Sequence, residues 1–225
     1  MSKHIQVVVF DFDGVFVLDS DAVFKKEAWG IALQRWPGYE TFLKEGNQLY
    51  GSGKPGGRIE IMGYIFECLG EQAEMIPMLV QSAAQAFDDH VQTRIRDAGL
   101  VPHALEMLEE LWNRGIRLYL NSGTATSALQ RSARNLKINH LFSAILGSTK
   151  EPFGGSKTEN LQYVADQEQV GPAAILMVGD GESDYQAALE FGCNFVGIAN
   201  KWNQWGKEKP FSLITDLQDV PRFVN

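Results

Sequence analysis

The sequence predicts an α/β fold, in which a mostly parallel sheet is interrupted by an all-helical segment, and three observations predict it. Residues 5–10 form a short apolar run, which suits a strand buried on both faces. From about residue 20 to 98 the apolar residues recur at helical spacing, without a convincing strand. After Gly99 strand and helix patterns alternate, which implies right-handed crossovers between parallel strands.

Four helices are expected in the helical segment, where Gly70 suits the end of the third helix and Pro77 the first turn of the fourth. After Gly99, strands are expected at 116–120, 142–146, 174–178 and 194–198, and 211–215 fits an edge strand. The helices between them are expected at 103–114, at 126–136, from Lys157 onward and at 184–191. We therefore expect two domains, with residues 1–16 and 99–225 forming the core and residues 17–98 the helical insertion.

The composition excludes some function classes. The 225 residues are 44% hydrophobic and 21% charged, which is typical of a folded chain. The net charge of −8 argues against nucleic acid or an anionic membrane as the main partner, because both need a basic face. A small anionic substrate is still compatible with this negative charge, because a metal ion or a lysine can make the electrostatic potential positive at one site.

The two cysteines, Cys68 and Cys193, lie far apart in apolar surroundings, so we expect buried thiols rather than a disulfide. No signal peptide or membrane span is visible in the sequence. The expected compartment is reducing and cytoplasmic.

Asp11 and Asp13 come directly after the first strand. If strand geometry continued, both side chains would point the same way at the carboxyl edge of the sheet, where open α/β sheets bind ligands. Two close carboxylates repel each other, and a bound cation would relieve that repulsion. An ordinary acidic turn explains the same residues equally well.

Further polar residues follow the other strands. Ser122, which precedes Gly123 and a helix, can offer a hydroxyl and backbone N–H groups to an anion, although an ordinary turn is the favoured explanation of that segment alone. Asp180 and Asp184 follow the strand at 174–178. With Asp11 and Asp13, these carboxylates predict a site for a hard cation, and Mg²⁺ is the natural occupant.

Lys157 opens a helix, where a positive charge is unfavourable to the helix dipole. A nearby carboxylate or phosphate would explain it. A solvated surface lysine is the alternative, and Lys150 lies only seven residues away.

Taken together, these residues resemble the four motifs of the haloacid dehalogenase superfamily, in the subgroup with a helical cap and its phosphoglycolate phosphatase-like branch. The motifs are Asp11-Phe12-Asp13-Gly14-Val15, Ser122, Lys157 and Gly179-Asp180-Gly181-Glu182-Ser183-Asp184. The resemblance covers essentially the whole chain and implies a Rossmann-like core with an inserted helical cap. Val15 departs from it, because that branch usually has threonine there.

The resemblance implies a role for each motif residue. Asp11 would attack phosphorus to form an aspartyl-phosphate, and Asp13 would act as general acid and base. Halide-cleaving relatives lack this second carboxylate, so Asp13 favours phosphate transfer. The ligands of Mg²⁺ would be Asp11, the backbone carbonyl of Asp13 and Asp180, with Asp184 close by or bound through water. The phosphoryl oxygens would be held by Ser122, Lys157 and the backbone N–H groups of Phe12 and Gly123.

The cap would choose the substrate, and its glycine-rich loop carries Lys54 and Arg58 as candidate contacts to a second polar group. Solvated charges on a loop are nearly as good an explanation, and Lys54 leaves the Schiff-base chemistry of phosphonate-cleaving relatives weakly open.

The sequence leaves three candidate functions. The favoured one is a Mg²⁺-dependent phosphatase for a small phosphorylated metabolite, such as phosphoglycolate or a sugar phosphate. A phosphomutase of the β-phosphoglucomutase type and a catalytically silent binding module are the alternatives. Either a monomer or a homodimer is compatible with the sequence.

Overall fold

The computed structural model describes residues 4–50, 57–148 and 154–224. The chain divides into two compact units, one formed by Met1–Asp19 with Ala98–Asn225 and the other by Ser20–Asp97.

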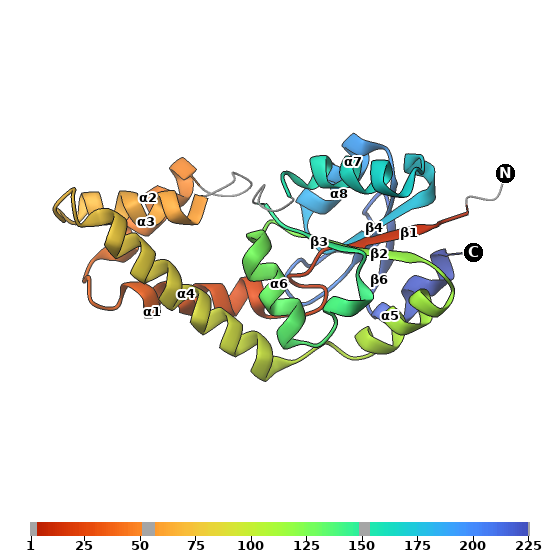
Figure 1. Ribbon diagram of the computed structural model, residues 1–225, viewed down its shortest axis with the longest axis horizontal. Coiled ribbons are helices and arrows are strands. Elements are labelled where there is room, and N and C mark those ends of the chain that lie inside the picture. The colour runs from red at the N-terminus through yellow and green to blue at the C-terminus, as the bar shows by residue number, and fades with distance from the viewer. Residues whose placement is uncertain (1–3, 51–56, 149–153, 225) are drawn as a thin grey trace. The chain divides into compact units, whose positions relative to one another are not determined.

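The first unit contains a six-stranded sheet with the order β3-β2-β1-β4-β5-β6 (Figure 1). All five pairs of neighbouring strands are parallel. The strands are β1 (Val7–Phe10), β2 (Arg117–Asn121), β3 (Ala144–Leu146), β4 (Ile175–Gly179), β5 (Asn194–Ile198) and β6 (Ser212–Ile214). The predicted α/β class is confirmed, and the apolar run near the start of the chain forms β1 between β2 and β4.

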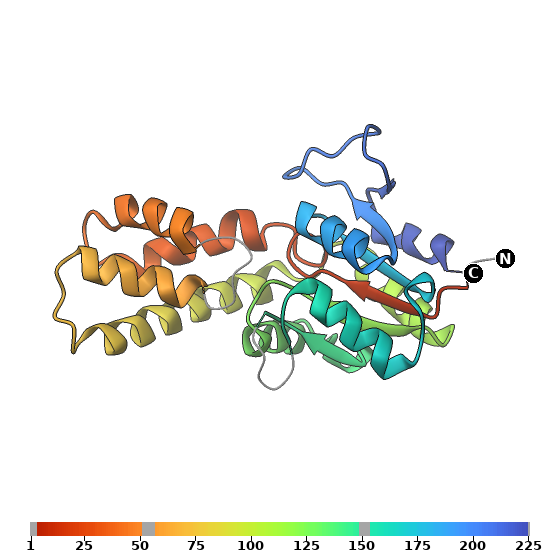
Figure 2. The ribbon, with the colours of Figure 1, turned by 90° about the horizontal axis from the view of Figure 1, so that it is seen from above.

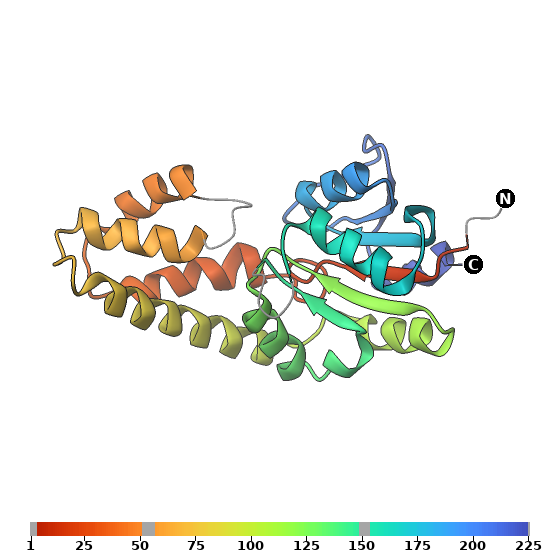
Figure 3. The same ribbon diagram turned by 45° about the horizontal axis from the view of Figure 1, so that its top comes forward.

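Helices cover both faces of this sheet, as Figures 1 and 3 show. Val7 and Val9 of β1 share a buried cluster with Leu161 and Val164 of α7 and with Ala187 of α8. Because side chains alternate along a strand, Val8 and Phe10 face the opposite layer. The helices are α5 (Ala104–Asn113), α6 (Thr126–Asn135), α7 (Lys157–Glu168) and α8 (Glu182–Phe191), with short 3₁₀ turns η2 (Asn139–Leu141), η3 (Pro172–Ala174) and η4 (Leu217–Phe223).

The second unit consists of helices joined by turns, without a strand among its described residues (Figure 2). A π-helical turn, η1 (Ser20–Phe24), leads into α1 (Lys25–Leu33), and α2 (Tyr39–Tyr50) packs against α3 (Gly57–Cys68). The long helix α4 (Ile76–Ala98) returns the chain to the first unit. None of the helices in the described parts of the chain combines the length and apolar character needed to cross a bilayer.

One local expectation is wrong. Cys68, expected to be buried, is exposed as the last residue of α3. In α5 the buried face contains Ala104, Met107, Leu108 and Leu111, whereas Leu105 and Trp112 are exposed.

Candidate active site

The register of the sheet brings three loops to one edge. Phe10 at the end of β1 pairs with Leu120 of β2 on one side and Val178 of β4 on the other. The residues that follow these strands therefore emerge side by side. The backbone N–H of Asp11 donates to the carbonyl of Val178 at 2.9 Å, which fixes the first carboxylate against the end of β4.

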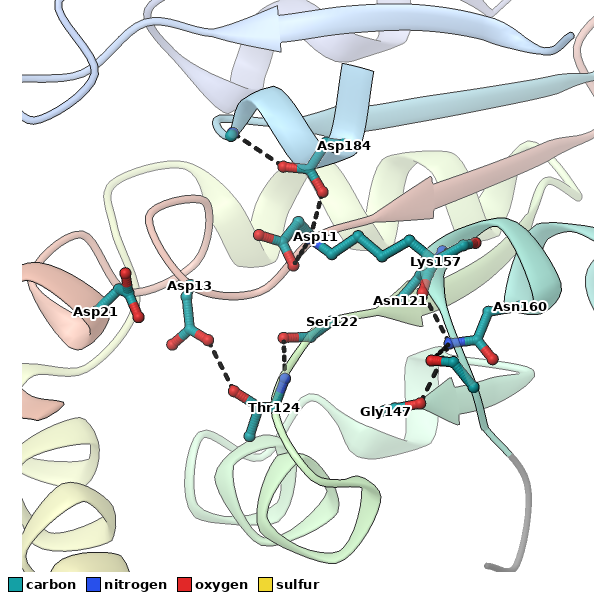
Figure 4. Close-up of polar contacts among 12 residues, drawn as sticks. Asp11, Asp13, Asp21, Asn121, Ser122, Thr124, Gly147, Lys157, Asn160 and Asp184 are labelled. Atoms are coloured by element: carbon teal, nitrogen blue, oxygen red, sulfur yellow. Dashed lines mark hydrogen bonds and ion pairs between the residues drawn. The ribbon is translucent and has the colours of Figure 1, made fainter. Parts of the chain in front are cut away.

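Three carboxylates and a lysine meet at this edge, and Figure 4 shows Asp11, Asp184 and Lys157 among them. One oxygen each from Asp11, Asp180 and Asp184 lies within 4.8 Å of the others. The Nζ atom of Lys157 is 3.0 Å from Oδ1 of Asp11 and also forms an ion pair with Asp184. Lys157 is the first residue of α7, and its side chain carries the charge away from the helix end toward these anions.

Burial and mutual repulsion perturb the charges of this cluster. Burial and the neighbouring Asp184 raise the pKa of Asp11 well above its ordinary value, although Lys157 opposes that shift. Burial raises the pKa of Asp180 to about 6, although a hydrogen bond from Asn200 opposes it. Burial alone would lower the pKa of Lys157, but Asp11 and Asp184 raise it above its ordinary value. One ammonium therefore faces three carboxylates, which leaves an excess of negative charge.

The residues present fit a divalent cation. Oδ1 of Asp11 is buried and accepts no hydrogen bond of standard geometry, although the Lys157 ammonium lies 3.0 Å away. Two glycines leave room for the carboxylates, because a Cβ at Gly14 would lie 2.1 Å from Oδ2 of Asp180 and one at Gly179 would lie 2.4 Å from Cγ of Asp184. Closely spaced carboxylate oxygens are the ligands that Mg²⁺ prefers.

Asp13 lies in a different environment. Its Oδ2 accepts a hydrogen bond from Oγ1 of Thr124 at 2.9 Å, and its side chain is not a member of the three-carboxylate cluster. Strand geometry does not continue beyond Phe10, because the N–H of Phe16 donates to the carbonyl of Phe12 and closes a turn. The i, i+2 spacing therefore separates the side chains of Asp11 and Asp13 instead of placing them together, as Figure 4 shows.

The loop after β2 is compact and close to Asp13. Ser122 is buried, its Oγ accepts the N–H of Thr124 at 3.1 Å, and its own N–H donates to Leu146 at 3.0 Å. Gly123 is exposed, and Phe12 is buried. Ser122 is thus held at the same edge as Asp11 and Lys157 (Figure 4).

Sequence reasoning missed a buried amide network behind Lys157. Asn121 donates to the backbone carbonyl of Lys157 at 2.9 Å and accepts from Asn160 at 2.9 Å. Asn160 also donates to the carbonyl of Gly147 at 3.2 Å, so the network ties β2, α7 and the end of β3 together. The position of Asn121 directly after a strand was the only signal in the sequence.

Sequence reasoning also missed Asn200 and Asn203, which follow β5. Asn200 donates to Oδ2 of Asp180 at 2.7 Å, and Asn203 donates to the backbone carbonyl of Asp180 at 2.9 Å. Their place after a strand could have drawn attention to them, as it did for Asp180.

The cap candidates are Lys54 and Arg58. Lys54 is not among the described residues. Arg58, in the helical unit, forms an ion pair with Asp88 at 2.9 Å, and its guanidinium lies 4.4 Å from the centroid of the Phe87 ring. These contacts fix the side chain within its own unit, and a role in substrate binding stays a prediction.

The fold and this edge define the class of protein, an α/β enzyme whose buried carboxylates and lysine converge where parallel strands end. A family model described as a haloacid dehalogenase-like hydrolase matches residues 5–192, and the chain belongs to that family. The resemblance stated from the motifs is therefore confirmed.

Individual relatives include phosphatases and a dehalogenase. A phosphoglycolate phosphatase from Vibrio cholerae is 25% identical over 202 residues, which cover 89% of this chain and 87% of the relative. The crystal structure of a predicted phosphoglycolate phosphatase from Haemophilus somnus matches with a TM-score of 0.72 and 20% identity over 100% of both chains. A 2-haloacid dehalogenase from Pseudomonas syringae matches with a TM-score of 0.73 and 18% identity over 97% of both chains. The fold alone therefore does not choose between these two chemistries.

Proposed function

We propose that the protein is a Mg²⁺-dependent phosphoric monoester hydrolase that acts on a small phosphorylated metabolite through an aspartyl-phosphate. The observation that carries the proposal is the separation of two carboxylates. Asp11 lies in the buried cluster with Lys157, while Asp13 is held outside it by Thr124. Two carboxylates in different environments suit two different roles. The curated relatives named as phosphoglycolate phosphatases support the same reaction class.

In the first half-reaction, a carboxylate oxygen of Asp11 attacks the phosphorus, and the bond between phosphorus and the ester oxygen breaks. Asp13 donates a proton to that leaving oxygen, so the metabolite departs as an alcohol. The hydrogen bond from Thr124 holds the Asp13 carboxyl group, which limits its rotation before it transfers the proton.

In the second half-reaction, Asp13 takes a proton from water, and the water oxygen attacks phosphorus. The bond between phosphorus and Asp11 breaks, which returns the carboxylate and releases inorganic phosphate. The same Asp13 side chain thus acts as acid and then as base, which returns the enzyme to its starting protonation state.

Charge on the phosphoryl oxygens is opposed by groups of this chain. Lys157 supplies a fixed positive charge, Ser122 a hydroxyl, and Phe12 and Gly123 backbone N–H groups. The side chains of Asp11, Asp180 and Asp184 and the backbone carbonyl of Asp13 would hold the Mg²⁺. When bound, the ion screens the anionic substrate from the carboxylates and stabilises charge on the transferring group.

The test is phosphate release from a panel of phosphorylated metabolites that includes phosphoglycolate and sugar phosphates. We expect release with Mg²⁺, loss of release with a chelator, and a loss on the order of 10⁴-fold in Asp11→Asn. Asp13→Asn should form the phosphoenzyme slowly, because its leaving group lacks an acid.

Two results would contradict the proposal. Phosphate release that survives Asp11→Asn would exclude Asp11 as the nucleophile. Interconversion of sugar phosphates without net phosphate release would instead identify a phosphomutase.

A further inference from the structure

The loop after β5, residues 199–203, contacts the candidate metal site although no motif marks it. Asn200 donates through Nδ2 to Oδ2 of Asp180 at 2.7 Å and to the carbonyl of Gly14 at 3.2 Å. Gly14 belongs to the loop after β1 and Asp180 to the loop after β4, so one amide joins three loops of the first unit. The half-buried Asp180 carboxylate has less freedom to rotate with such a partner.

The opposite end of the Asn200 amide is also fixed. Its Oδ1 accepts the N–H of Trp202 at 2.8 Å and the N–H of Asn203 at 3.1 Å, which is the pattern of an Asx turn. Only an oxygen can accept from these N–H groups, so the nitrogen must be the atom that faces Asp180. The turn therefore determines which end of the amide reaches the carboxylate.

Asn203 fixes the backbone of Asp180, the residue whose side chain Asn200 contacts. Its Nδ2 donates to the carbonyls of Asp180 at 2.9 Å and Ile198 at 2.8 Å. Its Oδ1 accepts from the N–H groups of Asn200 at 3.2 Å and Trp205 at 3.1 Å. One asparagine thus holds the side chain of Asp180 and the other its main chain.

Aromatic packing holds this loop on the sheet. The ring centroid of Trp205 lies 5.1 Å from that of Phe211, and Phe211 lies 4.8 Å from Phe195 of β5. Gly197 allows the approach, because a Cβ there would lie 2.6 Å from Phe211 and 2.9 Å from Trp205. These contacts restrict the loop, and a loop held by its own packing loses little conformational entropy when a ligand binds.

We propose that Asn200 is a positioning residue that holds the Asp180 carboxylate for a divalent cation, acting through Asp180 and not as a ligand itself. The proposal rests on the proposed function, because it gives Asp180 the role of metal ligand. Partners of metal ligands typically contribute 10- to 100-fold to metal affinity, because they hold the ligand in its binding orientation.

The test measures Mg²⁺ affinity directly, by calorimetric titration of the metal-stripped full chain with MgCl₂. Asn200→Ala removes both the donor to Asp180 and the acceptor of the Asx turn. Asn200→Ser keeps a hydroxyl that can accept the N–H of residue 202, but its side chain is too short to serve Asp180 as well. Comparing the two variants separates the contact with Asp180 from the shape of the loop.

The matched control is Asn194→Ala, at the other end of the same strand. Asn194 donates at 3.0 Å to the carbonyls of Ala173 and Ile175, so its loss also removes amide-to-carbonyl bonds, but not beside the carboxylates. The melting temperature of the Asn194→Ala variant should fall below that of the wild type. The Mg²⁺ dissociation constant of this variant should stay within about twofold of the wild-type value.

We expect Asn200→Ala and Asn200→Ser to raise the Mg²⁺ dissociation constant by about tenfold or more. The Mg²⁺ concentration for half-maximal phosphate release should rise by a similar factor, while kcat at saturating Mg²⁺ stays near the wild-type value. If Asn200→Ala does not fold, the Asn200→Ser titration decides the question.

Unchanged Mg²⁺ affinity in a folded Asn200 variant would overturn the proposal. Wild-type affinity in Asn200→Ser beside weakened affinity in Asn200→Ala would also overturn it, because the turn alone would then be responsible. Wild-type protein that binds no Mg²⁺ would contradict the proposed function itself, and that result is read from the wild-type titration before any variant is compared.

Discussion

At the scale of single residues, the environment of each carboxylate decides its chemistry. Asp11 and Asp184 are buried and share one ammonium, that of Lys157. Removing charges from water is costly, and a buried ion pair offsets that cost only when its geometry is good. The site therefore keeps its carboxylates close at an energetic cost, which a bound cation would reduce. Asp13 lies outside the cluster and accepts a hydrogen bond from Thr124, although its charge still contributes to the raised pKa of Asp11 and of Asp180.

Gly14 is constrained both by its backbone conformation and by the closeness of the Asp180 side chain. Its φ of +74° is unfavourable for other residues, and a Cβ would lie 2.1 Å from Oδ2 of Asp180. We predict that Gly14→Ala lowers the free energy of unfolding by about 1–3 kcal/mol and weakens Mg²⁺ binding, because Asp180 must move. Urea denaturation and a Mg²⁺ titration measure the two effects.

The control for Gly14 is Gly171→Ala. Gly171 has an ordinary φ of −80°, and its Cβ would meet no atom within 4 Å. That substitution should leave Mg²⁺ affinity unchanged and stability equal or slightly higher. Wild-type Mg²⁺ affinity in Gly14→Ala would contradict the prediction. It would show that Mg²⁺ binding does not depend on the position that Asp180 occupies beside Gly14.

At the scale of elements, the loops after the strands carry the site and the helices fix those loops. The capping box at the start of α7, between Ser156 and Glu159, sets the position from which Lys157 extends. The Asn121–Asn160 network then binds the backbone of Lys157 to β2 and to the end of β3. The alternation of strands and helices was predictable from local pattern, whereas the amide networks join residues far apart in the sequence.

The cap of η4 gives a prediction with a defined pH dependence. Asp216 accepts the N–H of Gln218 at 2.9 Å and pairs with His103 at 2.8 Å, and these contacts lower the pKa of Asp216. Because the folded pKa is below the unfolded one, the stabilisation is present at neutral pH and is lost as the pH falls through the folded pKa. We predict that Asp216→Ala lowers the free energy of unfolding by about 1 kcal/mol at pH 7, and that the difference narrows below about pH 4.

Urea denaturation at pH 7 and near pH 3 measures this effect. Asp219→Ala is the control, because Asp219 lies on the same 3₁₀ turn and its carboxylate pairs with the exposed Arg222. That surface pair should contribute less than about 0.5 kcal/mol. Equal losses for Asp216→Ala at the two pH values would exclude the carboxylate as the cause.

At the scale of the whole molecule, the site is assembled from segments that are remote in sequence but meet at one sheet edge. Asp11 follows β1, Ser122 follows β2, Asp180 follows β4 and Asn200 follows β5. The strand order β3-β2-β1-β4-β5 places these loops beside one another within the first unit. The helical unit interrupts the sequence between β1 and β2 without interrupting the sheet.

This assembly predicts a specific pattern of protection on metal binding. Mg²⁺ should slow amide hydrogen exchange in three separate segments, near residues 11–17, 179–185 and 199–204, because opening any of them disrupts the same site. Exchange of the full chain with and without Mg²⁺, read by mass spectrometry, measures this, and Asp180→Ala should abolish it. Protection spread evenly over the chain, or confined to a single segment, would contradict a shared site.

The sequence by itself determined the α/β class, the order of strands and helices, and the family, because hydrophobic periodicity and the residues after strands are local signals. It also predicted that Asp11, Asp180 and Asp184 come together, because parallel strands in one sheet end at the same edge, whereas Lys157 was added to them only through the family resemblance. Only the tertiary structure decided that Asp13 turns away from the cluster toward Thr124, because a turn stabilised by backbone hydrogen bonds ends the strand at Phe10. Only the tertiary structure revealed Asn200 and Asn203, because an amide has no recognisable role until folding places a carboxylate beside it.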